Sequence, residues 1–347
     1  MTSLDDAFDA VPALAYTHHP KWGETVHRSD PAAIRRDITS LAVRPGDRVL
    51  EIGTGSGYSS AILASLCGPH GRVTSIDISD ELVARATAIH REHDIRGVDL
   101  HVADGLADYP SAASYHRMVA WCAPPRLPRT WVDQVEDDGR IVACLPIAAL
   151  PSTTLIATIT VRDGRPQLLD VTGGGYAQST ATAVDDALTI PGRWVDYCDH
   201  QPDPSWISIA WRDDDPLRTG ARAALDRLLH AGHTAAHHDM STAWRSWTAY
   251  TAALGDRHVS LVSLRNRVRG IGHTTPDTAA VILADGTIIA DTPHSPSLTI
   301  LRTWLDRWET AGRPDAGSFP TTLVPYRGTG LAGWDLRVRM PKPDGRQ

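Results

Sequence analysis

The stretch Val49-Leu50-Glu51-Ile52-Gly53-Thr54-Gly55-Ser56-Gly57-Tyr58 decides the fold of this 347-residue chain. Its apolar start predicts a buried strand, its glycines predict a tight turn, and the residues from Tyr58 onward predict a helix. Glycine has no Cβ, so Gly53, Gly55 and Gly57 let the backbone turn sharply and approach a ligand closely. A helix that begins at such a turn presents free N–H groups. The stretch therefore predicts a cofactor loop between a strand and a helix.

The spacing of the glycines separates two classes of cofactor. A dinucleotide loop needs G-x-G-x-x-G, whereas the sixth position here is Tyr58. This leaves a nicotinamide oxidoreductase as a weaker alternative. G-x-G-x-G behind an acidic residue instead suits S-adenosylmethionine, whose amino-acid end carries both charges and no phosphate. The loop residues expected to bind this cofactor are Glu51, Gly53, Thr54, Gly55, Ser56, Gly57 and Tyr58.

Strands and helices alternate around this loop. Strands are expected over residues 47–52, 72–77, 98–102, 117–121 and 139–145, and helices over 58–66, 81–93 and 128–135. The β-α-β-α order is typical of a parallel sheet with right-handed crossovers, which makes the fold class α/β and Rossmann-like. A hairpin over 153–161 and 167–171 follows, turned at Asp163-Gly164. We assign residues 1–195 to this domain.

Residues 196–347 are expected to form a C-terminal α+β extension. It contains a helical run over 216–231 and a pair of strands, 279–283 and 287–290, separated by Asp285-Gly286. A further helix with apolar anchors ends before Gly312-Arg313-Pro314. Most of the 11 tryptophans lie in this half, where such side chains are more often core than recognition surface.

Two acidic residues beyond the loop lie where a nucleoside would be bound. Asp77 ends the second expected strand, where a doubly wound fold places an acid on the ribose hydroxyls; a cap on the next helix is the alternative. Ile78 is expected to line the same site. Asp104 and Gly105 follow the third strand and suit the amine and ring of adenine, with a simple Asp-Gly turn as the alternative.

Glu51 lies inside an otherwise apolar strand, where a carboxylate is costly to bury without a partner. We interpret it as a partner for the ammonium group of the cofactor or for N–H groups of the loop. A structural ion pair with a nearby arginine is the alternative.

The histidines of the second half predict no metal site. His233 and His237 have the spacing of neighbours on one helix face, and His230 and His238 lie close by in the sequence. Metal binding would need a third ligand and a supporting second shell, and no H-E-x-x-H motif is present. We therefore expect these histidines to be solvated.

Bulk composition excludes several classes of partner. A net charge of −7 argues against a general nucleic-acid surface, and no apolar run reaches the ~20 residues of a membrane span. The N-terminal MTSLDDAFDA lacks the features of a secretory signal. The four cysteines form no C-x-x-C pair and are interpreted as small buried side chains in a reducing cytosol. We expect a cytoplasmic protein without nucleic-acid or membrane partners, and the oligomeric state stays open.

The motifs together resemble one enzyme family. Ser29-Asp30-Pro31, the stretch 49–58, Gly71–Asp77, Asp104-Gly105 and Gly139–Val142 are similar to protein-L-isoaspartate O-methyltransferases. The resemblance covers about half of the chain and implies a class I methyltransferase fold and S-adenosylmethionine as cofactor. In that family the serine of a Ser-x-Pro element touches the substrate carboxyl, which makes Ser29 the candidate catalytic residue. The family's ribose acid is usually Glu, so Asp77 is a mild departure.

The extension carries a second resemblance. Leu301–Pro314 is similar to extensions of actinobacterial relatives that act in the biosynthesis of ribosomal peptides such as lanthipeptides, lasso peptides and graspetides. This implies methylation of an Asp side chain in a modified precursor peptide, followed by succinimide or isoaspartate formation. Repair of L-isoaspartyl residues in damaged proteins is the alternative within the same chemistry. A binding module with a decayed site is a third alternative, opposed by the intact loop.

Overall fold

A computed structural model describes residues 2–19, 23–24, 30–107, 114–180, 190–265 and 268–341. The chain forms two compact units, each built from separate parts of the sequence. The first unit comprises Met1–Leu145, Ile156–Asp186 and Leu323–Asp335, and the second comprises Pro146–Leu155, Ala187–Thr322 and Leu336–Gln347. The predicted boundary between two domains, at residues 195 and 196, remains a prediction.

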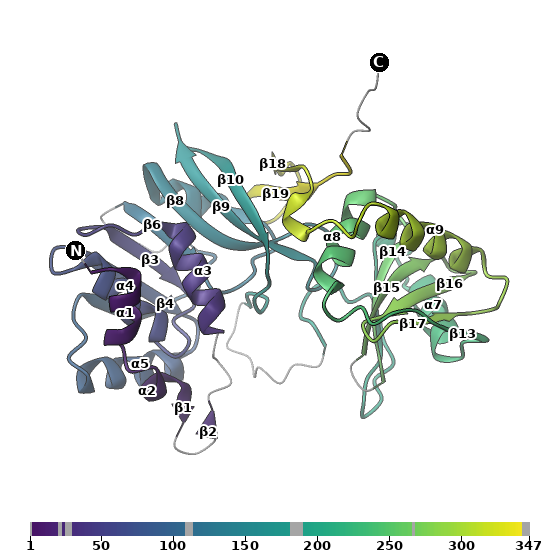
Figure 1. Ribbon diagram of the computed structural model, residues 1–347, viewed down its shortest axis with the longest axis horizontal. Helices are drawn as coiled ribbons and strands as arrows, with labels where there is room; N and C mark the ends of the chain where they lie inside the picture. The colour runs from purple at the N-terminus through teal and green to yellow at the C-terminus, as the bar shows by residue number, and fades with distance from the viewer. Residues whose placement is uncertain are drawn as a thin grey trace. The chain divides into compact units, whose positions relative to one another are not determined.

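The first unit is built on a seven-stranded sheet in the order β10-β9-β8-β6-β3-β4-β5 (Figure 1). Strands β8, β6, β3, β4 and β5 run parallel. The chain order reverses between β3 and β6, which is the topological switch point where α/β sheets bind ligands. The strands are β3 (Arg48–Ile52), β4 (Arg72–Asp77), β5 (Val98–Val102), β6 (Tyr115–Ala120), β8 (Val135–Pro146), β9 (Thr154–Arg162) and β10 (Arg165–Gly173).

Helices cover this sheet. Ile38, Ile62 and Val119 belong to one buried cluster, which packs α3 and α4 against one face of the sheet. Figure 1 shows α1, α3 and α4 in front of these strands. The remaining elements that begin in this unit are short strands and helices: α1 (Leu4–Ala10), α2 (Ala13–Thr17), β1 (His18–His19), β2 (Gly23–Glu24), α3 (Pro31–Leu41), α4 (Tyr58–Cys67), α5 (Asp80–Glu92), β7 (Leu127–Pro128) and α6 (Arg129–Asp133).

The second unit has its own seven-stranded sheet, in the order β11-β12-β14-β15-β16-β17-β13. The paired strands run antiparallel. Helix α7 packs Leu225 and Leu228 onto one face, in a cluster with Val262 and Val281. The elements are β11 (Tyr197–Cys198), β12 (Trp206–Ile209), η1 (Arg212–Asp214), α7 (Thr219–Leu229), β13 (His233–Ala236), α8 (Trp244–Leu254), β14 (Val259–Leu264), β15 (Val268–Thr274), β16 (Ala279–Leu283), β17 (Thr287–Ala290), α9 (Pro296–Thr310) and η3 (Ala316–Ser318). Strands β18 (Thr321–Pro325) and β19 (Gly333–Val338) form a separate three-stranded sheet with β7, and residues 323–335 belong to the first unit.

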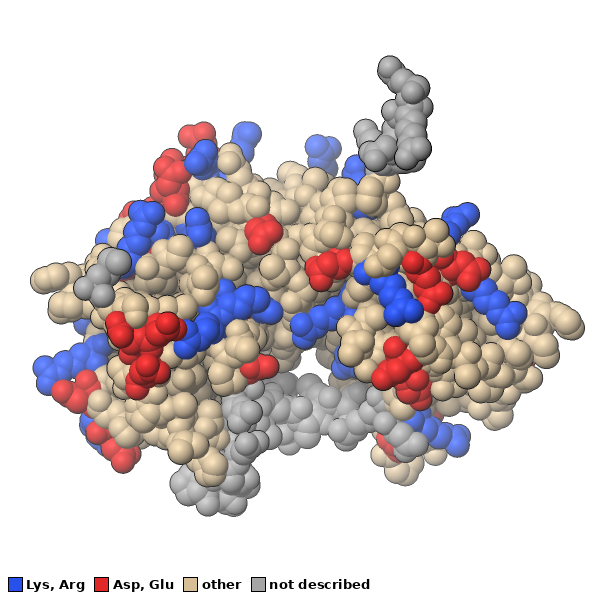
Figure 2. Space-filling model, viewed as in Figure 1, with Lys and Arg blue, Asp and Glu red and all other residues tan. Residues whose placement is uncertain are grey.

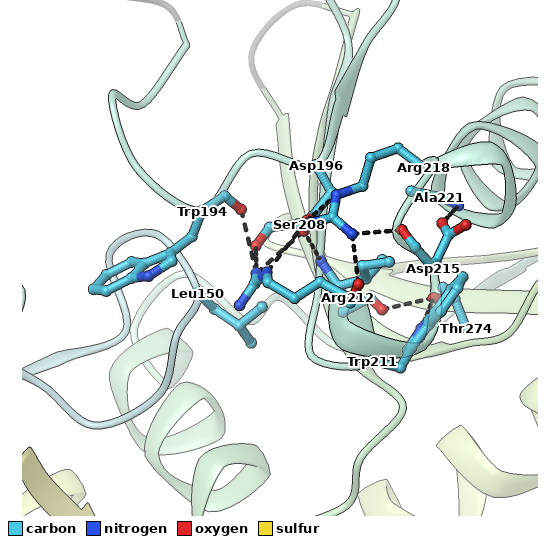
Figure 3. A network of polar contacts seen from close by, with 12 residues as sticks. Leu150, Trp194, Asp196, Ser208, Trp211, Arg212, Asp215, Arg218, Ala221 and Thr274 are labelled. Carbon is cyan, nitrogen blue, oxygen red and sulfur yellow. Dashed lines mark hydrogen bonds and ion pairs between the residues drawn. The ribbon is translucent and has the colours of Figure 1, made fainter. Parts of the chain in front are cut away.

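A buried ion-pair network holds the start of this second unit (Figure 3). The Asp196 carboxylate forms ion pairs with Arg212 at 3.1 Å and with Arg218 at 3.0 Å, and the Asp196 side chain is only 3% exposed. It also accepts a hydrogen bond from the Ile209 backbone N–H. Nearby, Asp215 accepts from the Ala221 N–H at 2.8 Å, within the first turn of α7. The network ties strand, turn and helix together before the rest of the sheet begins.

The surface charges, the apolar segments and the cysteines add three observations. Figure 2 shows basic and acidic side chains interspersed on the face in view. Among the residues described, no helix is both long and apolar enough to cross a bilayer. Of the four cysteines, Cys67, Cys144 and Cys198 are buried and Cys122 is half-buried.

Candidate functional site

The predicted cofactor-binding residues lie around one edge of the first sheet. Ile52 pairs with Ile76, and Asp77 pairs with Val102, so β3, β4 and β5 end side by side. The carboxyl ends of parallel strands therefore bring the loop after β3, the acid that ends β4 and the Asp-Gly pair after β5 to one edge, beside the switch point. The predicted strand–loop–helix arrangement of residues 49–58 is confirmed.

The glycine loop depends on the absence of side chains. Gly53, Gly55 and Gly57 have φ values of +91°, +52° and +85°, in the left-handed region that glycine adopts without strain. A Cβ on Gly57 would lie 2.8 Å from the Cβ of Ala86 and 3.2 Å from Nε2 of His90. The last glycine of the loop thus lets α4 begin directly against α5.

Glu51 is completely buried and held by three donors. Its Oε1 accepts from the Ser59 hydroxyl at 2.5 Å and from the Trp121 indole N–H at 2.8 Å, and its Oε2 accepts from Ser75 at 2.6 Å. These bonds favour the ionised form, but burial dominates and raises the pKa of Glu51 to about 7. Among the contacts described for this carboxylate, none is with an arginine or a loop N–H. Its proposed contact with the cofactor stays a prediction.

Asp77 fastens the loop to the neighbouring strand. One carboxylate oxygen accepts from the Gly55 N–H at 2.9 Å, and the other accepts from the Ser79 N–H at 3.0 Å. The cap on α5 is Ser79, whose hydroxyl accepts from Leu82 N–H. Each carboxylate oxygen has a second lone pair, so Asp77 keeps the capacity to accept from a ribose hydroxyl.

Asp104 and Gly105 form a tight turn after the end of β5. Asp104 is exposed, and its carboxylate accepts from the Leu106 N–H at 2.9 Å. A Cβ on Gly105 would lie 2.3 Å from Cγ2 of Ile52, and its carbonyl accepts from the indole of Trp131 at 2.6 Å. Gly105 is therefore a position of close approach between the ends of β3 and β5, and its role beside adenine stays a prediction.

The other predicted cofactor residues lie around the same loop. Thr54 is buried, with its hydroxyl 2.7 Å from that of Ser75. Ser56 and Tyr58 are buried at the start of α4, and Tyr58 packs edge-on against Phe8. Ile78 is half-buried next to Asp77. The N-cap residue of α4 is Gly57, which has no side chain to cap the helix, and the Ser56 hydroxyl accepts from the Tyr58 N–H at 3.4 Å.

A second chain of contacts, absent from the sequence predictions, supports this edge. Trp121, which donates to Glu51, packs edge-on against Tyr176 at a ring distance of 5.6 Å. The Tyr176 hydroxyl donates to the buried Asp37 carboxylate at 2.5 Å, and Arg36 pairs with that carboxylate at 2.6 Å. Trp121 ends the strand predicted over residues 117–121, and this position at a strand end is the signal that the sequence offers for it. The sequence offers no signal for Tyr176, because Tyr176 comes close to Trp121 only in the folded chain.

Two predictions have other outcomes. Ser29 lies outside the described residues; the next residue, Asp30, caps α3 by accepting from the Ala32 N–H at 2.8 Å. The helical spacing of the histidines is wrong, because residues 233–236 form strand β13, paired with β17. His237 and His238 lie beside Glu309 instead.

A family model described as Protein-L-isoaspartate(D-aspartate) O-methyltransferase matches residues 5–164. A protein-L-isoaspartate O-methyltransferase of Methanoculleus marisnigri is 33% identical over 161 residues, covering 46% of this chain and 70% of the relative. One from Aeropyrum pernix is 36% identical over 147 residues, covering 41% of this chain and 56% of the relative. One from Archaeoglobus fulgidus is 36% identical and is covered over 54% of its length. The chain thus spans little more than half of these last two relatives.

Solved structures resemble the chain more distantly. A crystal structure from Plasmodium falciparum, assigned to the same family and in complex with S-adenosyl-L-homocysteine, has a TM-score of 0.42 at 15% identity, covering 51% of this chain and 90% of that one. Another, named protein-L-isoaspartate O-methyltransferase, has a TM-score of 0.42 at 16% identity, covering 90% of this chain and 81% of that one.

Proposed function

Because the chain belongs to the protein-L-isoaspartate O-methyltransferase family, we propose that it is an S-adenosylmethionine-dependent carboxyl O-methyltransferase of peptides or proteins. The observation that carries this proposal is the meeting of the glycine loop, Asp77 and Asp104 at the ends of three neighbouring strands. The names of the relatives favour isoaspartyl residues as substrate, which was the alternative in the sequence analysis.

The residues present suit such a cofactor. The positive φ values of Gly53, Gly55 and Gly57 allow the tight turn of the loop, and the first turn of α4 offers backbone N–H groups to a carboxylate. Asp77 would hold the ribose hydroxyls and Asp104 the adenine amine. When bound, S-adenosylmethionine supplies a methyl group on a sulfonium: the new C–O bond forms on a carboxylate as the C–S bond breaks and its electron pair stays on sulfur.

The protein's share of this reaction is positioning. The accepting carboxylate is already ionised, so the site needs no general base, and none was predicted from the sequence. Holding the two reactants at ~3–3.5 Å in a dry site supplies most of the acceleration. We assign Ser29 the hydrogen bond that orients the accepting carboxyl. Glu51, still the predicted partner of the cofactor's ammonium group, would also hold Ser59 and Trp121 in place beside the loop.

The decisive experiment compares three substrates under one set of conditions. Methyl transfer is measured on an isoaspartyl peptide, on the same peptide with normal Asp, and on a cyclised precursor peptide containing Asp. The proposal expects turnover of the isoaspartyl peptide and none of its normal counterpart. No methylation of any substrate, combined with no binding of S-adenosylhomocysteine by calorimetry, would restore the alternative of a decayed binding module.

The serine assignment has its own test. Ser29→Ala is expected to lower kcat/KM by on the order of 10–100-fold, since one hydrogen bond to a charged group is lost. Ser40→Ala, at the other end of α3, serves as the matched control and should keep full activity. Full activity in Ser29→Ala on the true substrate would remove Ser29 from the site.

A second candidate substrate is favoured by one observation. Residues 165–347 lie outside the family match, and they hold most of the second unit. We propose this unit as a peptide-recognition domain, in which case the substrate is an Asp side chain in a modified ribosomal precursor peptide and the product is a succinimide or isoaspartate. Turnover of the cyclised precursor well above that of the isoaspartyl peptide would favour this candidate over repair.

A further inference from the structure

The end of β15, in the second unit, brings two histidines and one aspartate together. Asp256 and His258 lie in the turn that leads from α8 into β14, and His273 lies near the end of β15, where it pairs with Val259. One ligand-type atom from each of the three side chains lies within 4.8 Å of the other two. The tight turn and the strand register hold these groups together.

A second layer of contacts orients the buried histidine. His273 is 5% exposed, and its Nδ1 lies 2.8 Å from the hydroxyl of Ser297 on α9. The ring of Trp304, about two turns further along the same face of α9, packs edge-on against the imidazole at 5.7 Å. With Nδ1 engaged, Nε2 is the nitrogen left for a ligand. Histidines that bind metals are held in this way by a partner on the other ring nitrogen.

The other two side chains form the open part of the cluster. Asp256 Oδ1 accepts from the His258 backbone N–H at 2.8 Å, which fixes the turn, and lies 3.7 Å from His258 Nδ1. The imidazoles of His258 and His273 lie 5.3 Å apart. About a third of the Asp256 and His258 side chains is exposed, which gives an ion from solvent a path to the buried His273.

We propose that Asp256, His258 and His273 bind a divalent transition-metal ion of the zinc class. Ligand atoms around four-coordinate zinc lie ~2.0–2.2 Å from the metal and so about 3.4 Å from one another, within reach of small side-chain rotations here. Two imidazoles and one carboxylate suit Zn²⁺ better than Mg²⁺ or Ca²⁺, which prefer oxygen ligands. Three protein ligands leave a fourth position for water. This departs from the sequence prediction of no metal site.

A second cluster in the same unit offers a matched control. His237, His238 and Glu309 also bring ligand atoms together. The Arg313 guanidinium lies 3.2 Å from Glu309 and 3.4 Å from His238 Nδ1. That fixed positive charge opposes a cation, so this cluster should leave metal binding unchanged when it is altered.

The test uses the full-length, untagged chain, stripped with a chelator and titrated with Zn²⁺ by calorimetry. The proposal expects one Zn²⁺ per chain and a visible Co²⁺ spectrum when Co²⁺ is used instead. His258→Ala and Asp256→Asn, both at partly exposed positions, should weaken binding by at least about 10-fold, and Ser297→Ala by about 10–100-fold. His237→Ala should bind as the unaltered chain does, and circular dichroism checks that each variant is folded.

Three outcomes would overturn the proposal. They are no uptake of Zn²⁺ at micromolar concentration by the unaltered chain, unchanged binding in folded His258→Ala, and loss of binding in His237→Ala alone. None of these readouts depends on methyl transfer, so the result is independent of the proposed function.

Discussion

At the scale of single residues, Gly57 is required for two reasons, its positive φ and its close contact with α5, and an experiment can separate them. Its φ of +85° strains any other residue, and a Cβ there would lie 2.8 Å from Ala86. Gly46 has a φ of +87° with nothing within 4 Å of the added Cβ. We expect Gly46→Ala to cost about 1 kcal/mol of unfolding free energy from backbone strain alone, and Gly57→Ala to cost about 3 kcal/mol because steric overlap is added. Urea unfolding measures both; equal losses would show that α5 adapts freely.

Glu51 gives a second prediction, in the pH dependence of stability. Burial raises its pKa to about 7 in the folded protein, above the ordinary value of 4.5. The folded state therefore binds more protons than the unfolded state between these values, and the contribution of Glu51 to stability falls as pH rises from 4.5 to 7. Glu51→Gln should fold, because its amide can accept from Trp121 and donate to Ser75.

The expected result is a difference between two pH series. From pH 5 to 8, the unaltered chain should lose on the order of 2–3 kcal/mol relative to Glu51→Gln, since each pKa unit corresponds to about 1.4 kcal/mol. Denaturant unfolding at a set of pH values measures this difference. Parallel curves for the two proteins would mean that Glu51 titrates at its ordinary value in the fold.

At the scale of elements, the third prediction concerns the hydrogen bond that joins Asp37 of α3 to Tyr176, which follows β10. The Tyr176 hydroxyl donates to the buried Asp37 carboxylate, whereas the buried hydroxyl of Tyr115 has no hydrogen-bond partner among the described residues. Tyr176→Phe should lose about 2 kcal/mol, as expected for a hydrogen bond to a charged group. Tyr115→Phe, the matched control, should change stability by less than about 0.5 kcal/mol. Comparable losses in the two variants would place the effect in ring packing instead.

The elements also show what the sequence could predict. Strands 72–77, 98–102, 279–283 and 287–290 are observed with the predicted bounds, because their β-branched runs end at clear turn residues. The helix predicted over 128–135 is shorter, Arg129–Asp133, and β8 already begins at Val135. The polar residues 136–138 conceal that strand. Its pairing with β6 and the contact of Glu136 with Ser114 extend it, and both arise only in the folded chain.

In the candidate site, too, the sequence could predict residues that lie in local patterns but not the contacts between residues far apart in the chain. Glu51, Asp77 and Asp104 could be placed because each lies at or near the end of a strand in a recognisable local pattern. The contacts of Glu51 with Ser75 and Trp121, and of Trp121 with Tyr176, join residues far apart in sequence. The same is true of the His258–His273 pair, whose register depends on β14 and β15, two strands that the sequence analysis did not predict.

At the scale of the whole molecule, the chain passes between its two units several times, and residues 323–335 return to the first unit. There Gly333 and Trp334 of β19 pair with Pro128 and Leu127 of β7. The Arg129 N–H donates to the Ala332 carbonyl at 2.9 Å. A linear boundary drawn from composition cannot reveal this return, because the pairing joins segments about 200 residues apart. Deleting everything after residue 200 would therefore damage the first unit as well.

This return carries the last prediction. Truncation after residue 320 removes the partner of β7, and amide hydrogen exchange over residues 127–135 should accelerate by at least about 10-fold, because backbone donors lose their acceptors. Truncation after residue 341 keeps β19 and should leave that exchange unchanged. Gly333→Ala should reproduce the first result in the full chain, since a Cβ there would lie 1.9 Å from the Leu127 carbonyl oxygen, whereas Gly330→Ala meets nothing within 4 Å. Amide exchange is measured by mass spectrometry. Unchanged protection over residues 127–135, both after truncation at residue 320 and in Gly333→Ala, would show that the first unit does not depend on residues 323–335.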